Sequence, residues 1–228
     1  MQTSLSSILK KSSLSLAVVL GALSASTASA ADKGFYGALN ASIGQTDEES
    51  FDYAAGANIE SEFEDGYGGS AAVGYNFGKI TPLGNIRTEV EAGYRTADIE
   101  SHSLNGGAPL AGPTGKGEVT YGLLNVYQDL NFGTSKLVPY IGAGVGYANV
   151  KYKNFGVAAI PDVLDDSYNA FAYQAIIGTA YEITPALALT VDYRYFATED
   201  KDVTTAIGNT TSIGYTSNNI TAGLRYNF

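Results

Sequence analysis

The segment ALALTVDYRYF, residues 186–196, decides the fold, because its side chains alternate strictly between two kinds. One face carries Leu187, Leu189, Val191, Tyr193 and Tyr195. The opposite face carries Thr190, Asp192 and Arg194. An apolar period of two predicts a β-strand, in which successive side chains point to opposite sides. The segment therefore predicts a strand that separates an apolar environment from a polar one.

The same alternation recurs along the rest of the chain from residue 34 onward. No segment after residue 30 approaches the 18 or so consecutive apolar residues of a membrane-spanning helix. We therefore predict an all-β protein. The eight predicted strands are residues 34–44, 66–77, 86–96, 118–132, 139–150, 169–182, 186–196 and 217–228.

The connections between these strands alternate in length. Long connections of this kind are uncommon in soluble domains. Long loops at one end and short turns at the other are typical of outer-membrane barrels. The sequence therefore predicts one domain, residues 31–228, folded as an eight-stranded antiparallel up-and-down transmembrane β-barrel. The predicted loops are residues 45–65, 97–117, 151–168 and 197–216, and the predicted turns are 78–85, 133–136 and 183–185.

The positions of the basic residues indicate which face meets lipid. The chain has four arginines, and all four fall within predicted strands on the face opposite the apolar residues. The lysines after residue 30 fall at the terminus, in turns and loops, or near strand ends. An Arg or Lys at the lipid midplane costs about 2–4 kcal/mol. This distribution favours a membrane barrel over a soluble sandwich, with the apolar face toward lipid.

The charged faces then point into a narrow lumen, which side chains fill in a barrel of eight strands. Strands 86–96 and 186–196 lie across from each other in such a ring. Burying charges is costly unless they are paired, so we predict an ion-pair network that plugs the lumen. The alternative is that the same charges line an ion path. The predicted lumenal residues are Arg87, Glu89, Glu91, Arg95, Asp129, Glu182, Asp192, Arg194 and Arg225.

The first thirty residues have the three parts of a secretory signal peptide. Lys10 and Lys11 precede an apolar stretch, residues 14–23, and Ala28-Ser-Ala30 forms a small-residue cleavage site. This apolar stretch is too short to span a membrane. We predict export and cleavage after Ala30.

Composition excludes several classes of function. The net charge of -10 argues against nucleic acid as a partner, and the absence of cysteine excludes disulfides and thiol chemistry. The single histidine, His102, lies between two serines in the predicted second loop. Adjacent residues of an extended segment point apart, so they do not readily form a nucleophile–base pair. We therefore expect a solvated histidine, no enzyme activity and no cofactor.

The predicted first loop, residues 45–65, holds eight carboxylates and no basic residue. Oxygen ligands at this density are candidates for weak divalent-cation binding. Their spacing matches no EF-hand loop, and a solvated acidic surface is the favoured alternative. The candidate residues are Asp47, Glu48, Glu49, Asp52, Glu60, Glu62, Glu64 and Asp65.

Five segments together resemble the outer-membrane barrels of the OmpA and opacity-protein types. They are KGFYG at 33–37, NVYQDL at 125–130, PYIGAGVGY at 139–147, FAYQA at 171–175 and the terminal GLRYNF at 223–228. The resemblance implies the outer membrane of a Gram-negative bacterium, with both chain ends in the periplasm. It also implies that Phe228 is part of a signal read by the barrel-assembly machinery. Because the sequence stops there, we expect this protein to be without the peptidoglycan-binding domain of full-length OmpA proteins.

Barrels of these types include adhesins, structural anchors, narrow pores and lipid-modifying enzymes, so the resemblance fixes no single activity. We expect a monomeric, non-enzymatic surface barrel whose loops make surface or adhesion contacts or support envelope integrity. The expected partners are outer-membrane lipid, lipopolysaccharide, the assembly machinery and an unidentified surface or host ligand. One alternative is a narrow porin-like channel for ions or small solutes. A lipid-acting barrel enzyme is the other.

Overall fold

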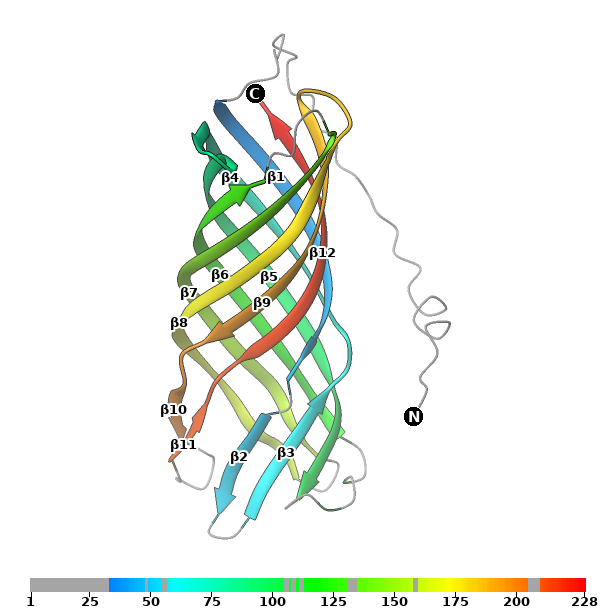
Figure 1. Cartoon of the computed structure of the whole chain (residues 1–228). Helices are drawn as coiled ribbons and strands as arrows, with labels where there is room; N and C mark the ends of the chain where they lie inside the picture. Colours follow the sequence, from blue (N-terminus) through cyan, green and yellow to red (C-terminus); the bar gives the residue numbers. More distant parts are fainter. Residues whose placement is uncertain are drawn as a thin grey trace.

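The computed structural model describes residues 33–47, 49–54, 57–104, 107, 110, 113–130, 135–157, 160–204 and 210–228. Within these ranges, eight antiparallel strands close into a ring in the order β1-β4-β5-β6-β7-β8-β9-β12 and back to β1 (Figure 1). No helix among the described residues is long and apolar enough to cross a membrane. The closed ring of eight strands confirms the predicted barrel. The ring strands are β1 (Gly34–Thr46), β4 (Gly66–Thr81), β5 (Gly84–Leu104), β6 (Pro113–Asp129), β7 (Leu137–Val157), β8 (Ile160–Glu182), β9 (Leu187–Thr198) and β12 (Thr216–Asn227).

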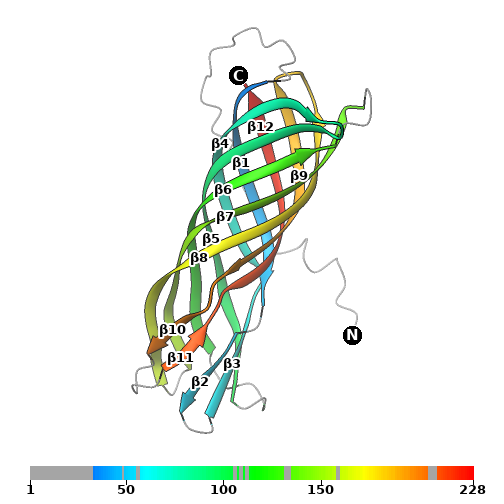
Figure 2. The ribbon, with the colours of Figure 1, turned by 60° about the vertical axis from the view of Figure 1, so that its left-hand side comes forward.

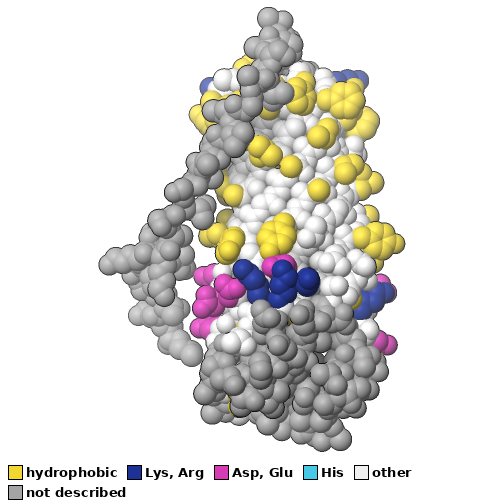
Figure 3. Space-filling view, turned by 180° about the vertical axis from the view of Figure 1, so that it is seen from behind, with side chains coloured by type: hydrophobic (Ala, Val, Ile, Leu, Met, Phe, Trp, Pro, Cys, Tyr) yellow, Lys and Arg dark blue, Asp and Glu magenta, His cyan; other side chains and the backbone are white. Residues whose placement is uncertain are grey.

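The outer wall of the ring carries the apolar side chains that the alternation predicts. Leu39, Val90 and Ile177 are examples, each about 60% exposed to the surroundings of the barrel. Figure 3 shows such side chains spread over a broad band of the wall. Exposed apolar area on this scale would be a liability in water and is the normal condition of a wall that faces lipid.

Aromatic side chains lie at both limits of this band. At one end Phe35 packs edge-on against Tyr75, with ring centres 4.9 Å apart. At the other end Tyr147 packs in the same way against Phe171, at 6.0 Å. Aromatic side chains form girdles where hydrocarbon gives way to lipid headgroups, and tyrosine is favoured there because its apolar ring carries a polar hydroxyl. These two levels therefore mark the limits of the membrane-embedded wall.

The ring closes where its first strand meets its last. β1 pairs with β12 from Tyr36 opposite Asn227 to Thr46 opposite Ser217. The Phe228 amide then donates to the Phe35 carbonyl at 3.0 Å. The Phe228 ring points outward and packs edge-on against Tyr226, with ring centres 5.5 Å apart. The final residue thus extends the seam by one more hydrogen bond.

Phe228→Ala is expected to slow assembly of the barrel in cells, because it removes the outward aromatic ring at the end of the closing strand. The readout is the amount of heat-modifiable, folded protein in outer-membrane fractions. Phe77→Ala is the matched control, since Phe77 is an outward aromatic residue that packs on Tyr75 away from the seam. Equal folded amounts of the two variants would contradict the special role of Phe228.

One end of the ring carries two additional hairpins, and we call it the hairpin end. The first consists of β2 (Glu49–Ala54) and β3 (Ala57–Phe63), and β3 continues the sheet by pairing with β5. The second consists of β10 (Lys201–Thr204) and β11 (Thr210–Ile213). Figure 2 shows both hairpins projecting beyond the ring. The opposite end, with the short turns and Phe228, is the turn end.

The prediction of loops at residues 45–65, 97–117, 151–168 and 197–216 was therefore wrong where these ranges form strands. Strands β5 to β8 also continue far past the predicted boundaries, and β7 and β8 stay paired as far as Val157 opposite Ile160. Beyond the lipid both faces of a strand meet polar surroundings, so the alternation that reveals a strand fades there. The interstrand hydrogen bonds continue regardless.

Residues 1–30, with the predicted signal peptide and its cleavage site, lie outside the described residues.

Candidate functional site

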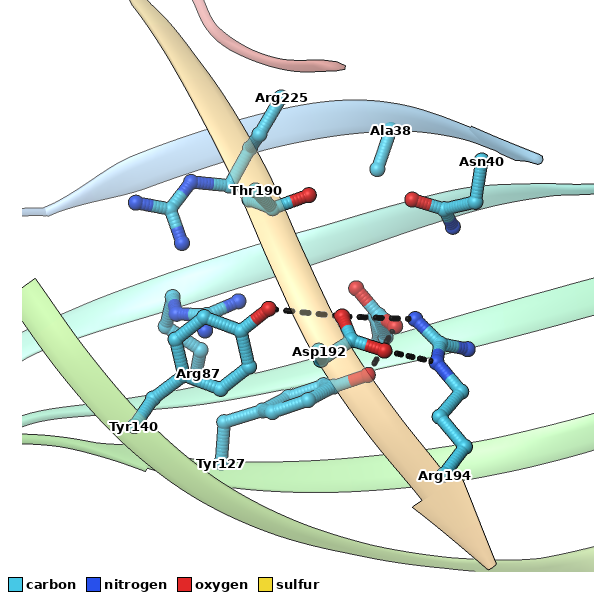
Figure 4. A pocket seen from close by; sticks show the side chains of 10 residues that line it. Ala38, Asn40, Arg87, Tyr127, Tyr140, Thr190, Asp192, Arg194 and Arg225 are labelled. Atoms are coloured by element: carbon cyan, nitrogen blue, oxygen red, sulfur yellow. Dashed lines mark hydrogen bonds and ion pairs between the residues drawn. The ribbon is translucent and has the colours of Figure 1, made fainter. Parts of the chain in front are cut away.

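The lumen of the ring holds a network of charged and aromatic side chains. Arg194 on β9 is its central cation and is almost completely buried. Its Nη1 donates across the lumen to Glu91 on β5 at 2.8 Å. Its Nε donates to Asp192 on its own strand at 2.6 Å, as Figure 4 shows. Tyr140 on β7 donates to the same Asp192 at 2.7 Å. Residues of three strands are thus tied together around one guanidinium.

A second ion pair joins neighbouring strands. Arg87 on β5 donates from Nε and Nη2 to both oxygens of Asp129 on β6, at 2.9 Å each. The Arg87 guanidinium carbon lies over the Tyr127 ring, 4.5 Å from its centre. A two-pronged Arg–carboxylate pair is among the strongest hydrogen-bonded contacts in proteins, and stacking on an aromatic ring adds to it.

Glu89 is buried and is held by neutral donors. Its Oε1 accepts from the Tyr127 hydroxyl at 2.7 Å and from the Asn125 amide at 3.1 Å. Its Oε2 accepts from the Tyr36 hydroxyl at 2.9 Å. Among the described side chains, Glu89 makes no ion pair within 4 Å. Charged and uncharged donors together therefore satisfy the buried carboxylates.

Two glycines on β7 make room for these side chains. A Cβ added to Gly142 would lie 2.6 Å from the Tyr127 ring. A Cβ added to Gly144 would overlap the Asn125 amide oxygen. The inner face of β7 therefore leaves the space that the lumenal aromatic and amide groups occupy.

The remaining two arginines reach no carboxylate within 4 Å among the described side chains. Arg95 lies over the Tyr121 and Phe196 rings, 4.9 and 4.5 Å from their centres, and donates to Ser217 at 3.3 Å. Arg225 leaves Nε and Nη1 without a protein partner and lines a cavity with Arg87. The cavity offers about 20 Å³, which suits one or two water molecules rather than a solute.

Toward the hairpin end the lumen is filled by apolar side chains. Val119, Val150, Tyr152 and Phe196 are nearly inaccessible to solvent and form one cluster with their neighbours. Tyr215, the residue before β12, joins the cluster, and its amide donates to the Thr198 hydroxyl at 2.9 Å. The lumen thus has two layers, a charged one near the turn end and a mainly apolar one near the hairpin end, which also contains Arg95.

Eight of the nine predicted lumenal residues lie inside the barrel. The exception is Glu182, which is exposed at the turn end of β8. Its backbone position opposite Ala188 puts it on the inward side of the alternation, as predicted. The sequence pattern gives the side on which a residue lies but not its height, so placing Glu182 in the network was wrong. The other eight are Arg87, Glu89, Glu91, Arg95, Asp129, Asp192, Arg194 and Arg225.

The expectation of a solvated histidine was also wrong. His102 lies on β5, is 2% exposed and pairs in register with Ser61 on β3. Its Nδ1 lies 2.9 Å from the Ser61 hydroxyl, and its Nε2 lies 3.2 Å from the Thr114 carbonyl. Because a carbonyl only accepts, Nε2 carries a proton, and in the neutral imidazole Nδ1 accepts from Ser61. Sequence reasoning missed Ser61, since only the register of the hairpin brings it to His102.

The structure describes part of the acidic candidate set. Asp47 is exposed and accepts from the Asn218 amide at 3.1 Å, and Asp65 accepts from Gln45 at 3.3 Å. Glu64 is exposed as well. Among the described residues, no group of three or more histidine and acidic side chains is arranged to hold a metal ion. Glu48 lies outside the described residues, and so do the side chains of Glu49, Asp52, Glu60 and Glu62.

Comparison with known proteins agrees with this geometry. The sequence profile of the outer membrane protein beta-barrel domain matches residues 15–228. The chain belongs to this family. An outer membrane protein of Gluconacetobacter diazotrophicus is 34% identical over 145 residues, covering 57% of this chain and 35% of that protein. Outer membrane protein PagN of Salmonella typhimurium is 31% identical over 139 residues, covering 57% of this chain and 56% of PagN. The match thus spans about a third of the Gluconacetobacter protein and just over half of PagN.

Solved structures of outer-membrane barrels share the fold of this family member. Neisserial surface protein A superposes with a TM-score of 0.53 at 16% identity, covering 86% of this chain and 97% of the other. OprG of Pseudomonas aeruginosa superposes with a TM-score of 0.52 at 13% identity, covering 86% and 96%. The protein is an outer-membrane β-barrel protein, and similarity at this level of identity shows the fold alone.

Proposed function

We propose that this protein is a non-enzymatic surface protein whose hairpin end recognises a partner outside the cell. The observation that carries the proposal is that the lumen of the ring is filled by side chains, whereas one end projects beyond it as strands. Figure 2 shows the projecting end. The outer wall faces lipid, and the lumen is filled by the protein's own side chains. In such barrels the longer connections face the outside of the cell, and binding residues concentrate on loops held by a rigid scaffold.

The base of the hairpin end is tied together by hydrogen bonds between strands far apart in sequence. The Asp47 amide donates to the Thr216 carbonyl at 3.0 Å, and the Glu64 amide donates to the Asp98 carbonyl at 2.8 Å. The hydroxyls of Thr46 and Tyr215 lie 3.3 Å apart. A platform held in this way loses little conformational freedom on binding, which favours recognition.

The charge of this end limits the kind of partner. Acidic residues outnumber lysines in the segments that form it, and residues 45–65 alone contribute eight carboxylates. Such a surface repels polyanions and favours neutral or basic partners. We therefore assign it a protein or neutral glycan partner rather than a sulfated polysaccharide.

The absence of an enzyme activity is part of the proposal. The Ser61 hydroxyl contacts a base, as in a nucleophile–base pair, but Ser61 is completely buried. A substrate needs direct access to the reacting oxygen. This burial supports a structural role for the pair, as an anchor of β3 on β5. Mass spectrometry of lipid A from cells with and without the protein tests the alternative of a lipid-acting enzyme.

The test of the recognition function is to shorten the hairpins separately. One variant replaces residues 48–63 with a short Gly-Ser linker, and the other replaces residues 201–213. Both are expected to keep heat-modifiable folding, because the eight ring strands remain. At least one is expected to lose the adhesion or phage-sensitivity phenotype that distinguishes producing cells from a deletion strain. The proposal fails if both shortened barrels keep every phenotype of the full chain.

Planar-bilayer recording separates this proposal from the channel alternative. We expect the purified barrel to give little or no steady conductance, because an apolar and a charged layer fill the lumen. A stable, large single-channel step carried by the full-length barrel would instead assign it a pore function.

A further inference from the structure

Arg225 on β12 is a buried cation that forms no ion pair among the described residues. It is 7% exposed, and its Nε and Nη1 have no hydrogen-bond partner within that part of the chain. Its guanidinium lines the small lumenal cavity, and Figure 4 shows the group extending from β12 toward Arg87. A guanidinium always carries its charge, so leaving its buried donors unpaired is costly. The fold therefore holds a cation whose donors suit an anion.

The carboxylates around the cavity are engaged with other groups. Both oxygens of Asp129 accept from Arg87, and those of Asp192 accept from another arginine and from a tyrosine. Glu89 accepts three hydrogen bonds from neutral side chains. Because Glu89 and Asp192 line the same cavity and repel an anion, an ion is expected on the side of Arg225.

Gly223 makes room for a further donor beside Arg225. It lies two residues before Arg225 and therefore on the same lumenal face of β12. A Cβ added to Gly223 would lie 2.8 Å from the Thr190 hydroxyl oxygen of β9 and would overlap the Asn40 amide oxygen of β1. The Thr190 side chain thus lies over β12 and lines the cavity together with Arg225. A hydroxyl beside a guanidinium supplies the kind of donors that an anion accepts from.

The size of the cavity selects a monatomic ion. Its volume of about 20 Å³ is the room of one or two water molecules, so it excludes molecular anions such as sulfate and phosphate. A halide ion takes the place of a water molecule and accepts from several N–H and O–H donors at once.

The turn end gives access to this site. In the register of the ring Arg225 lies between Ala38 on β1 and Ala188 on β9, and both neighbours have small side chains. Arg225 is also three residues from Phe228, the final residue of the seam. An ion can therefore enter from the turn end without crossing the apolar layer of the lumen.

We propose that Arg225 and Thr190 bind one halide ion in the lumenal cavity, and that chloride is the natural ligand. The ion neutralises the buried guanidinium and accepts from Nε, Nη1 and the Thr190 hydroxyl. It completes the charged layer and so stabilises a filled lumen. The site lies at the opposite end of the barrel from the hairpins, and it goes beyond the proposed function.

The direct test is X-ray diffraction from crystals of the full mature barrel grown in sodium bromide. Bromide occupies the same kind of site as chloride, and at the bromine absorption edge it gives an anomalous signal that water does not give. We expect an anomalous peak in the cavity, in contact with the Arg225 guanidinium. A cavity without such a peak overturns the proposal.

The test in solution is urea unfolding of the barrel in liposomes, with chloride exchanged for gluconate at constant ionic strength. Gluconate is too large for the cavity. A ligand that binds only the folded state multiplies the ratio of folded to unfolded protein by 1 + [L]/Kd. For a Kd of about 10 mM, raising chloride from about 1 mM to about 100 mM increases this ratio about tenfold.

Arg225→Met removes the cation with little loss of side-chain length. We expect it to lose both the bromide peak and the dependence of stability on chloride. Arg225→Lys keeps the charge but not the forked donors, so it should show a smaller chloride effect, and it replaces the methionine variant if that one does not fold.

Arg95→Met is the matched control. Arg95 is also a lumenal arginine without a carboxylate within 4 Å among the described side chains, but it lies over Tyr121 and Phe196 and does not line the cavity. This variant is expected to keep the bromide peak and the full chloride effect, whatever its own stability. The halide site is refuted if gluconate stabilises the unaltered barrel as much as chloride does, or if the Arg225 variants keep the full chloride effect.

Discussion

Arg194→Ala is expected to destabilise the barrel by about 3–5 kcal/mol, the usual cost of removing one partner from a buried ion pair. The substitution leaves the Glu91 and Asp192 carboxylates buried without the cation that both contact. Hydrogen bonds from Asn125 to Glu91 and from Tyr140 to Asp192 remain in the variant. The expected loss of stability is therefore nearer the lower end of this range. The change in the free energy of unfolding is measured by urea unfolding of the barrel in liposomes, with the folded fraction as the readout.

Two further variants make this prediction specific. Lys201→Ala removes an exposed charge 3.1 Å from Glu199 and is expected to cost about 0–1 kcal/mol. Glu91→Gln/Arg194→Met removes both members of the cross-lumen pair and should cost less than Arg194→Ala. Equal urea midpoints for Arg194→Ala and Lys201→Ala would refute the assignment of Arg194 as a buried, paired cation.

Gly144→Val is expected to be the second most damaging change. Its Cβ would overlap the Asn125 amide oxygen, so Asn125 must move away from Glu91 and Glu89. Overpacking of this kind costs roughly 1–3 kcal/mol, and buried carboxylates that lose a donor cost about the same again. The expected result is a large fall in the urea midpoint or a barrel that does not fold.

Gly122→Val is the matched control for this effect. Gly122 lies on the neighbouring strand β6, and a Cβ added there meets no heavy atom within 4 Å. Valine on the lipid-facing wall should change stability by no more than about 0.5 kcal/mol. If both glycine variants unfold at the same urea concentration, Gly144 is not needed to leave space for the lumenal side chains.

The sequence pattern predicted the ring because one physical constraint acts on each lipid-embedded residue. Wherever one face of a strand meets hydrocarbon and the other a charged lumen, alternation is strict, as in β9 around Arg194. That constraint ends at the headgroups. The hairpins β2–β3 and β10–β11 carry charges without a clean period of two, and they were therefore predicted as loops.

The sequence predicted most of the residues that lie in the lumen, but it did not predict which of them pair with each other. Arg194 does reach across to Glu91 on β5, as the ring geometry indicates. Arg87 instead pairs with Asp129 on the adjacent strand. The choice depends on register and on side-chain reach, neither of which the alternation contains. The contact between His102 and Ser61 was hidden for the same reason, because it depends on the pairing of β3 with β5.

The seam between β1 and β12 has a consequence for how the molecule is made. Tyr36 pairs with Asn227, so the ring contains a contact that spans nearly the whole chain. Contacts of such long sequence separation form late and slowly. Until the final strand has been synthesised and delivered, every partly formed sheet has two unpaired edges that invite aggregation. Closure therefore has to wait for β12, and the open sheet must be shielded until that strand is in place.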